Sequence, residues 1–313
     1  MLKQRVITAV FMLLLFTAGA TLLTPFYFGL CITLVILLAA WEWSRFLETT
    51  SYKARSSFTI AVAAACAGIF ILFGLTPGKA DMDNTGTLLI LILGCLFWLF
   101  SLYFLTHFKQ PAQPAELTES IQPAQAAQPT HTSASKQIWN RPSGIIALGL
   151  FALLPTLAGL LQLKFLMSGG WLVIGLIVQV AAVDVGAYFV GNRFGRRKLA
   201  PQLSPNKSWE GVWGGFALCM LITGLAVAVL LLRGQILQPV TIVLLLASAP
   251  LVSCFSVIGD LLESMLKRNA QLKDSGTLLP GHGGLLDRVD GLLAATPPAT
   301  LLLMFTLESG GIQ

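Results

Sequence analysis

Charged residues are scarce in this sequence. Lys, Arg, Asp and Glu make up 11% of the 313 residues, whereas soluble domains carry about 25%. Hydrophobic residues make up 55%, and the mean hydropathy is +0.78. This scarcity excludes an ordinary soluble globular domain, and the composition is typical of a membrane protein.

The sequence also lacks several motifs that mark other classes of protein. Its five cysteines form no CxxC pair and lie inside apolar runs, so they indicate neither a disulfide set nor a zinc site. The GxxxxGK[ST] spacing of a Walker A loop is absent. No internal repeat is visible, which argues against an inverted-repeat transporter.

What the sequence does have is a series of long apolar segments. Each is close to the ~20 residues that cross ~30 Å of hydrocarbon, and only helices suit them, because lipid offers no partner for backbone N–H and C=O groups. We therefore predict an all-α polytopic membrane protein with about nine transmembrane helices and a cytoplasmic N-terminus. The predicted spans are 5–23, 25–41, 58–76, 87–107, 144–163, 170–190, 211–232, 239–258 and 291–308.

The basic residues support this count. With alternating spans, all but three of the 20 Lys and Arg residues fall on the cytoplasmic side, and the exceptions are Lys79, Lys164 and Arg233. The net charge of +6 therefore reflects the predicted orientation of the protein in the membrane. It also suits contact with anionic lipid headgroups, and it does not require nucleic acid as a partner. Residues 109–141 are rich in Gln, Pro and Ala, which predicts a disordered cytoplasmic linker between N-terminal helices (1–108) and a C-terminal catalytic region (142–313).

Two polar features interrupt the C-terminal spans. Asp184 lies inside a predicted span, where an ionisable group is costly and indicates a functional site, although a structural cap or ion pair is the alternative. The glycines and prolines of 191–211 predict a loop. Its segment "SPNKSWEG" brings Ser204 and Lys207 to the start of a new helix, a combination that suits a phosphate, although the basic residues also fit a simple role in orientation.

The richest polar stretch is "SMLKRNAQLKDSGTLLPGHGGLLDRVDG", residues 264–291. With Asp260 just before it, Asp287 and Asp290 give three hard oxygen ligands of the kind that Mg²⁺ prefers beside substrate phosphates. Its glycines let backbone N–H groups approach a ligand closely. Helix capping and ordinary ion pairs are the simpler alternatives for these carboxylates. Positive charge comes from Lys267, Arg268, Lys273 and Arg288, and His282 is a further hydrogen-bond donor.

Together these features predict a polyphosphate site at the cytoplasmic face of a membrane enzyme whose second substrate is a lipid. The residues alone do not name the reaction. The stretch 264–291, however, resembles the signature of the phosphatidate cytidylyltransferases (CDP-diacylglycerol synthases), from Ser264 through Lys267–Arg268 and Asp287–Arg288 to Asp290 without a gap. The close likeness covers about 184–298. It departs from the family at Val185, Ser208 and Gly291, where Thr, Thr and Ser are common, and none of these changes removes a charged residue of the signature.

This resemblance implies the reaction of CTP with phosphatidic acid to give CDP-diacylglycerol and pyrophosphate, with Mg²⁺ as cofactor. It implies Asp260, Asp287 and Asp290 as metal ligands, and Asp184 as a ligand of a second cation or a positioning residue. Lys267 is then catalytic, and the substrate contacts are Lys207, Ser204, Arg268, Lys273, His282 and Arg288. The family also implies a homodimer in the bacterial inner membrane, with the active site facing the cytoplasm.

Four alternatives remain at this stage. A CTP-dependent lipid kinase acting on a polyprenol would share the membrane, nucleotide and metal, but would release CDP. A CDP-alcohol phosphotransferase is disfavoured because its DGxxAR motif is absent. A transporter or ion channel would explain Asp184 but not the carboxylates gathered in one loop. A structural role for an inactive paralogue is the fourth.

Overall fold

In the computed structural model, the described residues are 14–47, 51–78, 82, 84–108, 137–167, 169–278 and 283–308. Within them, eight helices are long and apolar enough to cross a membrane, and the stretch 14–22 is helical as well. The predicted all-α polytopic fold is confirmed. The eight helices correspond to the last eight predicted spans, and much of the first, 5–23, lies outside the described residues. The elements are α2 (Pro25–Trp43), η1 (Ser44–Leu47), α3 (Tyr52–Leu72), α4 (Asn84–His107), η3 (Ile138–Asn140), α5 (Pro142–Leu166), α6 (Trp171–Phe194), β1 (Lys198–Ala200), β2 (Ser204–Ser208), α7 (Trp209–Leu232), α8 (Pro239–Asn269) and α9 (Leu286–Glu308).

Several helices extend beyond the apolar runs that predict them. α3 begins at Tyr52 instead of 58, and α8 continues to Asn269 instead of ending at 258. Polar residues occupy these extra turns, because a helix that leaves the hydrocarbon can keep its backbone hydrogen bonds while exposing charged side chains. The 31 residues of α8 span about 46 Å, more than the ~30 Å of hydrocarbon, so this helix carries its last turns out of the apolar layer.

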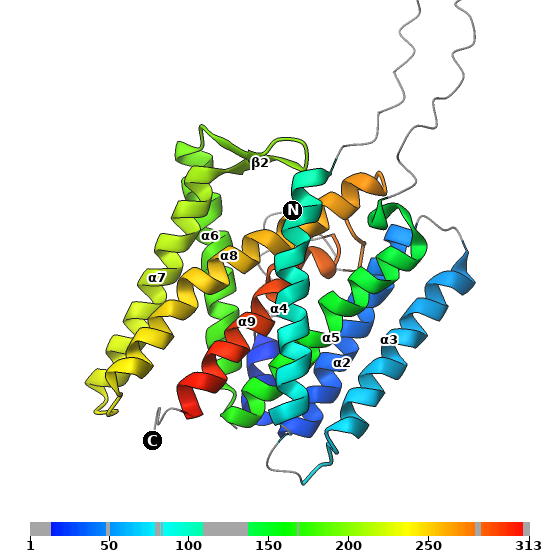
Figure 1. Cartoon of the computed structure of the whole chain (residues 1–313). Helices are drawn as coiled ribbons and strands as arrows, with labels where there is room; N and C mark the ends of the chain where they lie inside the picture. Colours follow the sequence, from blue (N-terminus) through cyan, green and yellow to red (C-terminus); the bar gives the residue numbers. More distant parts are fainter. Residues whose placement is uncertain are drawn as a thin grey trace, which may run out of the picture.

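α5 is the central helix of the bundle. It packs against α2, α3, α4 and α9, and most of its residues are buried (Figure 1). Small residues allow this close packing: a Cβ on Gly159 would lie 2.6 Å from Thr296 of α9. α8 and α9 pack along each other and run obliquely through the bundle. The polar end of α8 and the start of α9 are thereby held against helices from the first half of the chain.

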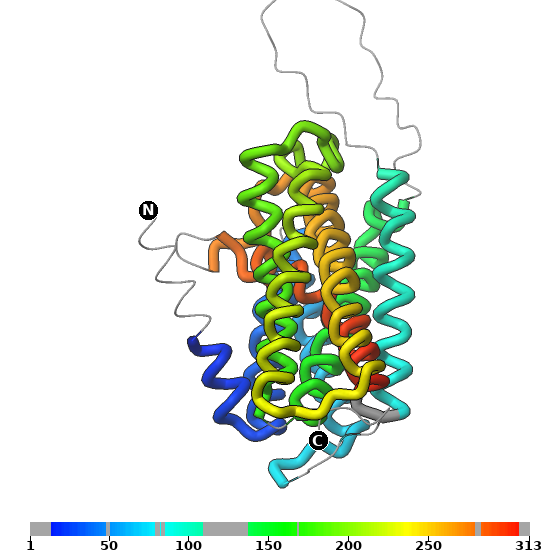
Figure 2. Tube along the Cα trace, turned by 90° about the vertical axis from the view of Figure 1, so that its left-hand side faces the viewer, coloured from blue at the N-terminus to red at the C-terminus, as the bar shows by residue number. Residues whose placement is uncertain are grey.

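α6 and α7 form the tightest helix pair. A Cβ on Gly186 would lie 2.5 Å from the carbonyl oxygen of Gly214, and one on Gly215 would lie 2.6 Å from that of Val183. Such contacts allow the two backbones to approach directly, as small residues do in membrane helix pairs. Figures 1 and 2 show the pair on one side of the bundle, beside α8.

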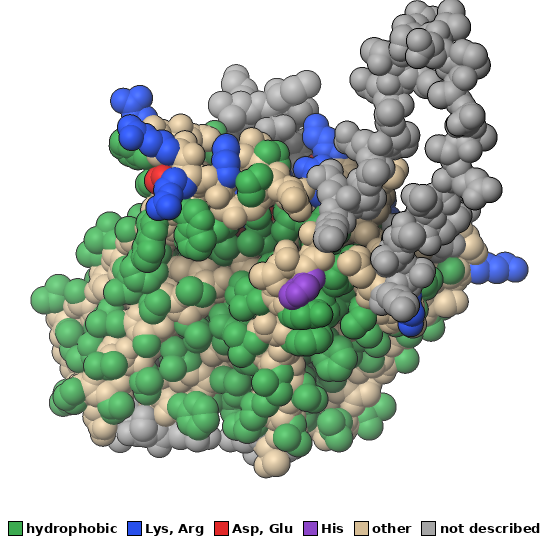
Figure 3. Space-filling model, turned by 45° about the horizontal axis from the view of Figure 1, so that its top comes forward, with side chains coloured by type: hydrophobic (Ala, Val, Ile, Leu, Met, Phe, Trp, Pro, Cys, Tyr) green, Lys and Arg blue, Asp and Glu red, His purple; other side chains and the backbone are tan. Residues whose placement is uncertain are grey.

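A short antiparallel hairpin joins α6 to α7. The predicted loop 191–211 is therefore only partly irregular, because α6 continues to Phe194 and β1 pairs with β2 in a register of Lys198 with Ser208. The Glu210 carboxylate accepts from the N–H groups of Arg196 and Arg197, and the Ser208 hydroxyl accepts from Gly211 N at 3.2 Å, capping α7. Figure 3 shows Lys and Arg side chains gathered at this end of the molecule.

The two halves of the chain pack together. α2 and α4 from the first half contact α5 and α9 from the second. Of the predicted linker, 109–136 lies outside the described residues. Its last part forms η3, where the Trp139 ring is buried against Phe104 and Phe108 and its carbonyl accepts from Asn269 at 3.1 Å. η3 is therefore a packed part of the fold.

Candidate active site

The polar end of α8 and the first turns of α9 bring three carboxylates together. Asp260 and Glu263 lie three residues apart on α8, so they share a face of the helix, and Asp290 faces them from α9. One ligand oxygen from each lies within 4.8 Å of the others. The helices approach closely here because position 259 is glycine: a Cβ on Gly259 would lie 2.3 Å from the carbonyl oxygen of Asp290. We call Asp260, Glu263 and Asp290 the acidic trio.

Glu263 is the most buried member of the trio, with 3% of its surface exposed. One carboxylate oxygen accepts from Lys267 Nζ at 3.1 Å, and the other has no hydrogen-bond partner among the described residues. A buried carboxylate is costly unless its charge is compensated. The orphaned oxygen and the three gathered carboxylates fit a divalent cation with hard oxygen ligands, so the trio could hold a metal ion.

Asp287 lies beside the trio with both of its oxygens occupied. Oδ1 accepts from Lys267 Nζ at 2.6 Å. Oδ2 accepts from the backbone N–H and the hydroxyl of Ser275, both at 3.0 Å, and from Gly284 N at 3.1 Å. Asp287 therefore connects Lys267 to the loop between α8 and α9. Its predicted role as a metal ligand stays a prediction.

The β hairpin supplies a second cation to the trio. Lys207, on β2, forms an ion pair with Asp260 of α8. Both side chains are partly exposed, at 24% and 37%, so the trio is accessible on this side. Asp184 of α6 interacts electrostatically with Asp260, Lys207 and Arg288. Residues far apart in the sequence thus form one cluster of alternating charge.

The remaining predicted site residues lie around this cluster. Ser204 lies on β2, opposite Ala200 of β1. Arg268 donates to the carbonyl of Leu203 at 3.3 Å, which ties the end of α8 to the hairpin. Lys273 and Arg288 are exposed. His282 lies outside the described residues, so its predicted substrate contact stays a prediction.

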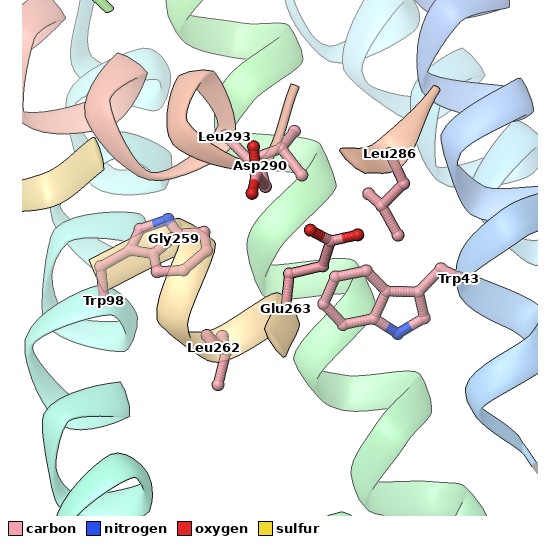
Figure 4. Close-up of a pocket in the computed structure, with 8 residues that line it drawn as sticks. All are labelled: Trp43, Trp98, Gly259, Leu262, Glu263, Leu286, Asp290 and Leu293. Atoms are coloured by element: carbon pink, nitrogen blue, oxygen red, sulfur yellow. The ribbon is translucent and has the colours of Figure 1, made fainter. Parts of the chain in front are cut away.

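A small pocket opens next to the trio. It has a volume of about 10 Å³ and is lined by Trp43, Trp98, Gly259, Leu262, Glu263, Leu286, Asp290 and Leu293. Figure 4 shows the Glu263 carboxylate between the two tryptophan rings. A cavity needs about 10–15 Å³ to hold one water molecule, so this one has room for about a single water-sized group. Trp43 of α2 and Trp98 of α4 belong to the first half of the chain.

Comparison with known proteins identifies the family of the chain. A model of the "Cytidylyltransferase family" matches residues 3–306. The chain belongs to the cytidylyltransferase family. It is 38% identical to a phosphatidate cytidylyltransferase of Pseudomonas aeruginosa, over 97% of both chains. It is 33% identical to one of Haemophilus influenzae, over 98% of this chain and 100% of that protein. A third, from Bacillus subtilis, is 43% identical over 40% of this chain and 45% of its own length.

Membership confirms the resemblance that the signature indicates, and it makes the chain an enzyme of the nucleotidyltransferase type. The family match also includes the first half of the chain, where the sequence offers no recognisable motif. Sequence reasoning missed Glu263 as a site residue, although its spacing of three from Asp260 and four from Lys267 was a usable signal. It also missed Trp43 and Trp98, which line the pocket and which their apolar surroundings make indistinguishable from core residues.

Proposed function

We propose that this protein is a phosphatidate cytidylyltransferase, which converts CTP and phosphatidic acid into CDP-diacylglycerol and pyrophosphate. The observation that carries the proposal is the acidic trio with an orphaned, buried Glu263 oxygen, bordered by Lys207 and Lys267 at one end of a membrane bundle. The names of two relatives that match almost the whole chain support the choice of substrates.

The reaction needs positioning and charge neutralisation more than covalent help. A phosphate oxygen of phosphatidate attacks the α-phosphorus of CTP, the bond from that phosphorus to the bridging oxygen breaks, and pyrophosphate leaves. No general base is needed, because a phosphate monoester is already ionised near pH 7. Lys207 and Lys267 hold positive charge at the edges of the trio, and Arg288 adds a third cation near Asp184. We assign these three side chains to the substrate phosphates.

The trio fits Mg²⁺ through its donor chemistry. Asp260, Glu263 and Asp290 offer carboxylate oxygens alone, with no nitrogen or sulfur ligand, which is the set that hard cations prefer. When bound, Mg²⁺ neutralises charge on the triphosphate and on the leaving pyrophosphate. Asp287 is retained as a proposed ligand or positioning group, and Asp184 as a proposed ligand of a second cation.

We further infer that the cluster faces the cytoplasm of a bacterial inner membrane. The Lys and Arg residues gathered at the hairpin end support this orientation. The apolar helices then hold the acyl chains of the lipid while its phosphate reaches the trio. A homodimer is the proposed oligomeric state.

The decisive experiment is to measure pyrophosphate release by the detergent-purified protein with CTP, Mg²⁺ and phosphatidic acid, with a polyprenol in a parallel reaction. We expect pyrophosphate only with phosphatidic acid, together with a CDP-lipid detected by mass spectrometry. Formation of CDP with the polyprenol, and no reaction with phosphatidate, would instead identify a lipid kinase. No turnover with either acceptor would refute an active cytidylyltransferase.

A further inference from the structure

Two side chains near the end of α2 hold the loop that joins α8 to α9. We call Glu42 and Arg45 the α2 clamp. Glu42 is buried, with 2% of its surface exposed, and its Oε2 accepts from Leu286 N at 2.7 Å and lies 3.4 Å from the Ser275 hydroxyl oxygen. Leu286 is the first residue of α9, so Glu42 places negative charge at the N-terminus of that helix, where it is favourable.

Arg45, in η1, binds the same loop through a backbone carbonyl group. Its Nη1 donates to the carbonyl oxygen of Ser275 at 2.7 Å. The loop lies directly on Glu42: a Cβ on Gly276 would lie 1.9 Å from Glu42 Oε1. The clamp therefore contacts the Ser275 hydroxyl and carbonyl and requires glycine at the next position.

The clamp is connected to the acidic trio through Ser275. The N–H and hydroxyl of Ser275 both donate to Asp287 Oδ2 at 3.0 Å. Oδ1 of Asp287 accepts from Lys267 Nζ at 2.6 Å, and the same ammonium donates to Glu263 at 3.1 Å. A continuous series of hydrogen bonds thus runs from α2, through the loop and α9, to α8.

We propose that Glu42 and Arg45 are positioning residues, which fix Ser275 and the start of α9 so that Asp287, Lys267 and the trio keep their reactive arrangement. This inference rests on the proposed function for its catalytic consequence. A carboxylate that only filled space would be replaceable by an apolar side chain, whereas this one is buried at a cost and aligned on the Leu286 N–H at the start of α9. Misplacing a reacting group by about 1 Å costs up to about 100-fold in rate, so a clamp remote from the substrates can control turnover.

The test compares Arg45→Gln with a matched control, Arg55→Gln. Arg55 also binds this segment, donating to Ser44 Oγ at 3.0 Å and to the Trp41 carbonyl at 3.2 Å, but neither of these bonds reaches the α8–α9 loop. In the detergent-purified protein, Arg45→Gln should lower kcat about tenfold or more with little change in KM for CTP. Arg55→Gln should leave kcat unchanged, even if its melting temperature falls.

A second readout needs no turnover. Hydrogen–deuterium exchange of the peptide around 272–290 reports the N–H groups of Ser275 and Gly284 that bind Asp287. We expect exchange about tenfold faster in Arg45→Gln and Glu42→Ala, and close to wild type in Arg55→Gln. Glu42→Gln keeps one acceptor oxygen and should restore most of the protection and the kcat lost in Glu42→Ala.

The outcomes separate this inference from the proposed function. If Arg45→Gln and Glu42→Ala lower the melting temperature but leave kcat and loop exchange unchanged, the clamp is only structural and the inference is wrong. If the wild-type protein releases no pyrophosphate, the proposed function fails. The exchange data then decide the positioning role alone: unchanged exchange in both variants overturns it.

Discussion

At the scale of single residues, Glu263 and Asp287 are both carboxylates, but their surroundings differ. Both bind Lys267, but Asp287 accepts four hydrogen bonds in all, whereas one oxygen of Glu263 has no partner in the described part of the chain. A satisfied carboxylate orders its surroundings, whereas the orphaned oxygen of Glu263, beside two further carboxylates, fits a cation. The two residues should therefore respond differently to loss of charge.

We predict that Glu263→Gln and Asp290→Asn weaken binding of Mn²⁺, used as a paramagnetic substitute for Mg²⁺, by at least about tenfold. Asp287→Asn should lower pyrophosphate release strongly while keeping Mn²⁺ affinity near that of wild type. Electron paramagnetic resonance of the purified protein measures the affinity, and Glu116→Gln, in the Gln- and Pro-rich segment, is the matched control. Equal weakening in Asp287→Asn would make Asp287 a metal ligand, as the signature predicts.

At the scale of elements, the α6–α7 pair positions the hairpin that carries Lys207. The two helices approach through glycines, and α7 is capped by Ser208 immediately after Lys207. The position of Lys207, which binds Asp260, therefore depends on how the backbones of α6 and α7 pack further along these helices. Disturbing that packing should affect both stability and the site.

We predict that Gly186→Ala destabilises the protein by about 1–3 kcal/mol, because the new methyl group overlaps the Gly214 carbonyl. Gly175→Ala is the matched control on the same helix, since a Cβ there meets nothing within 4 Å. Thermal unfolding in detergent measures the difference. A melting temperature for Gly186→Ala equal to that of Gly175→Ala would contradict the close approach of α6 and α7.

At the scale of the whole molecule, the proposed orientation in the membrane can be tested at the two ends of α7. Lys198 in the hairpin and Arg233 at the opposite end of α7 are both exposed. In a cysteine-free background, we predict that Lys198→Cys reacts with a membrane-impermeant maleimide only from the cytoplasmic side, and Arg233→Cys only from the other. Labelling in intact cells and in inverted vesicles distinguishes the two. The reverse pattern would refute the cytoplasmic site.

Much of this architecture was predictable, because membrane-spanning helices are recognisable in the sequence as long apolar runs. The run 239–258 predicts α8, and the signature predicts that Asp260 and Asp290 belong to one site. The further eleven residues of α8 were not predictable from hydropathy, because a helix leaving the membrane is polar. Glu42 was not predictable either: it is a single carboxylate beside an apolar run, and only the tertiary fold brings it to Ser275.

The length of α8 links the position of the acidic trio to the thickness of the membrane. The helix that crosses the hydrocarbon is the same helix that carries Asp260 and Glu263, so the depth of these carboxylates is set by the bilayer itself. Hydrophobic mismatch costs a fraction of a kcal/mol per Å and is relieved by tilting. A thicker or thinner membrane therefore changes the height of the reactive groups relative to the headgroup layer. We therefore expect the rate to depend on the acyl-chain length of the surrounding lipid, which assays in bilayers of defined thickness would measure.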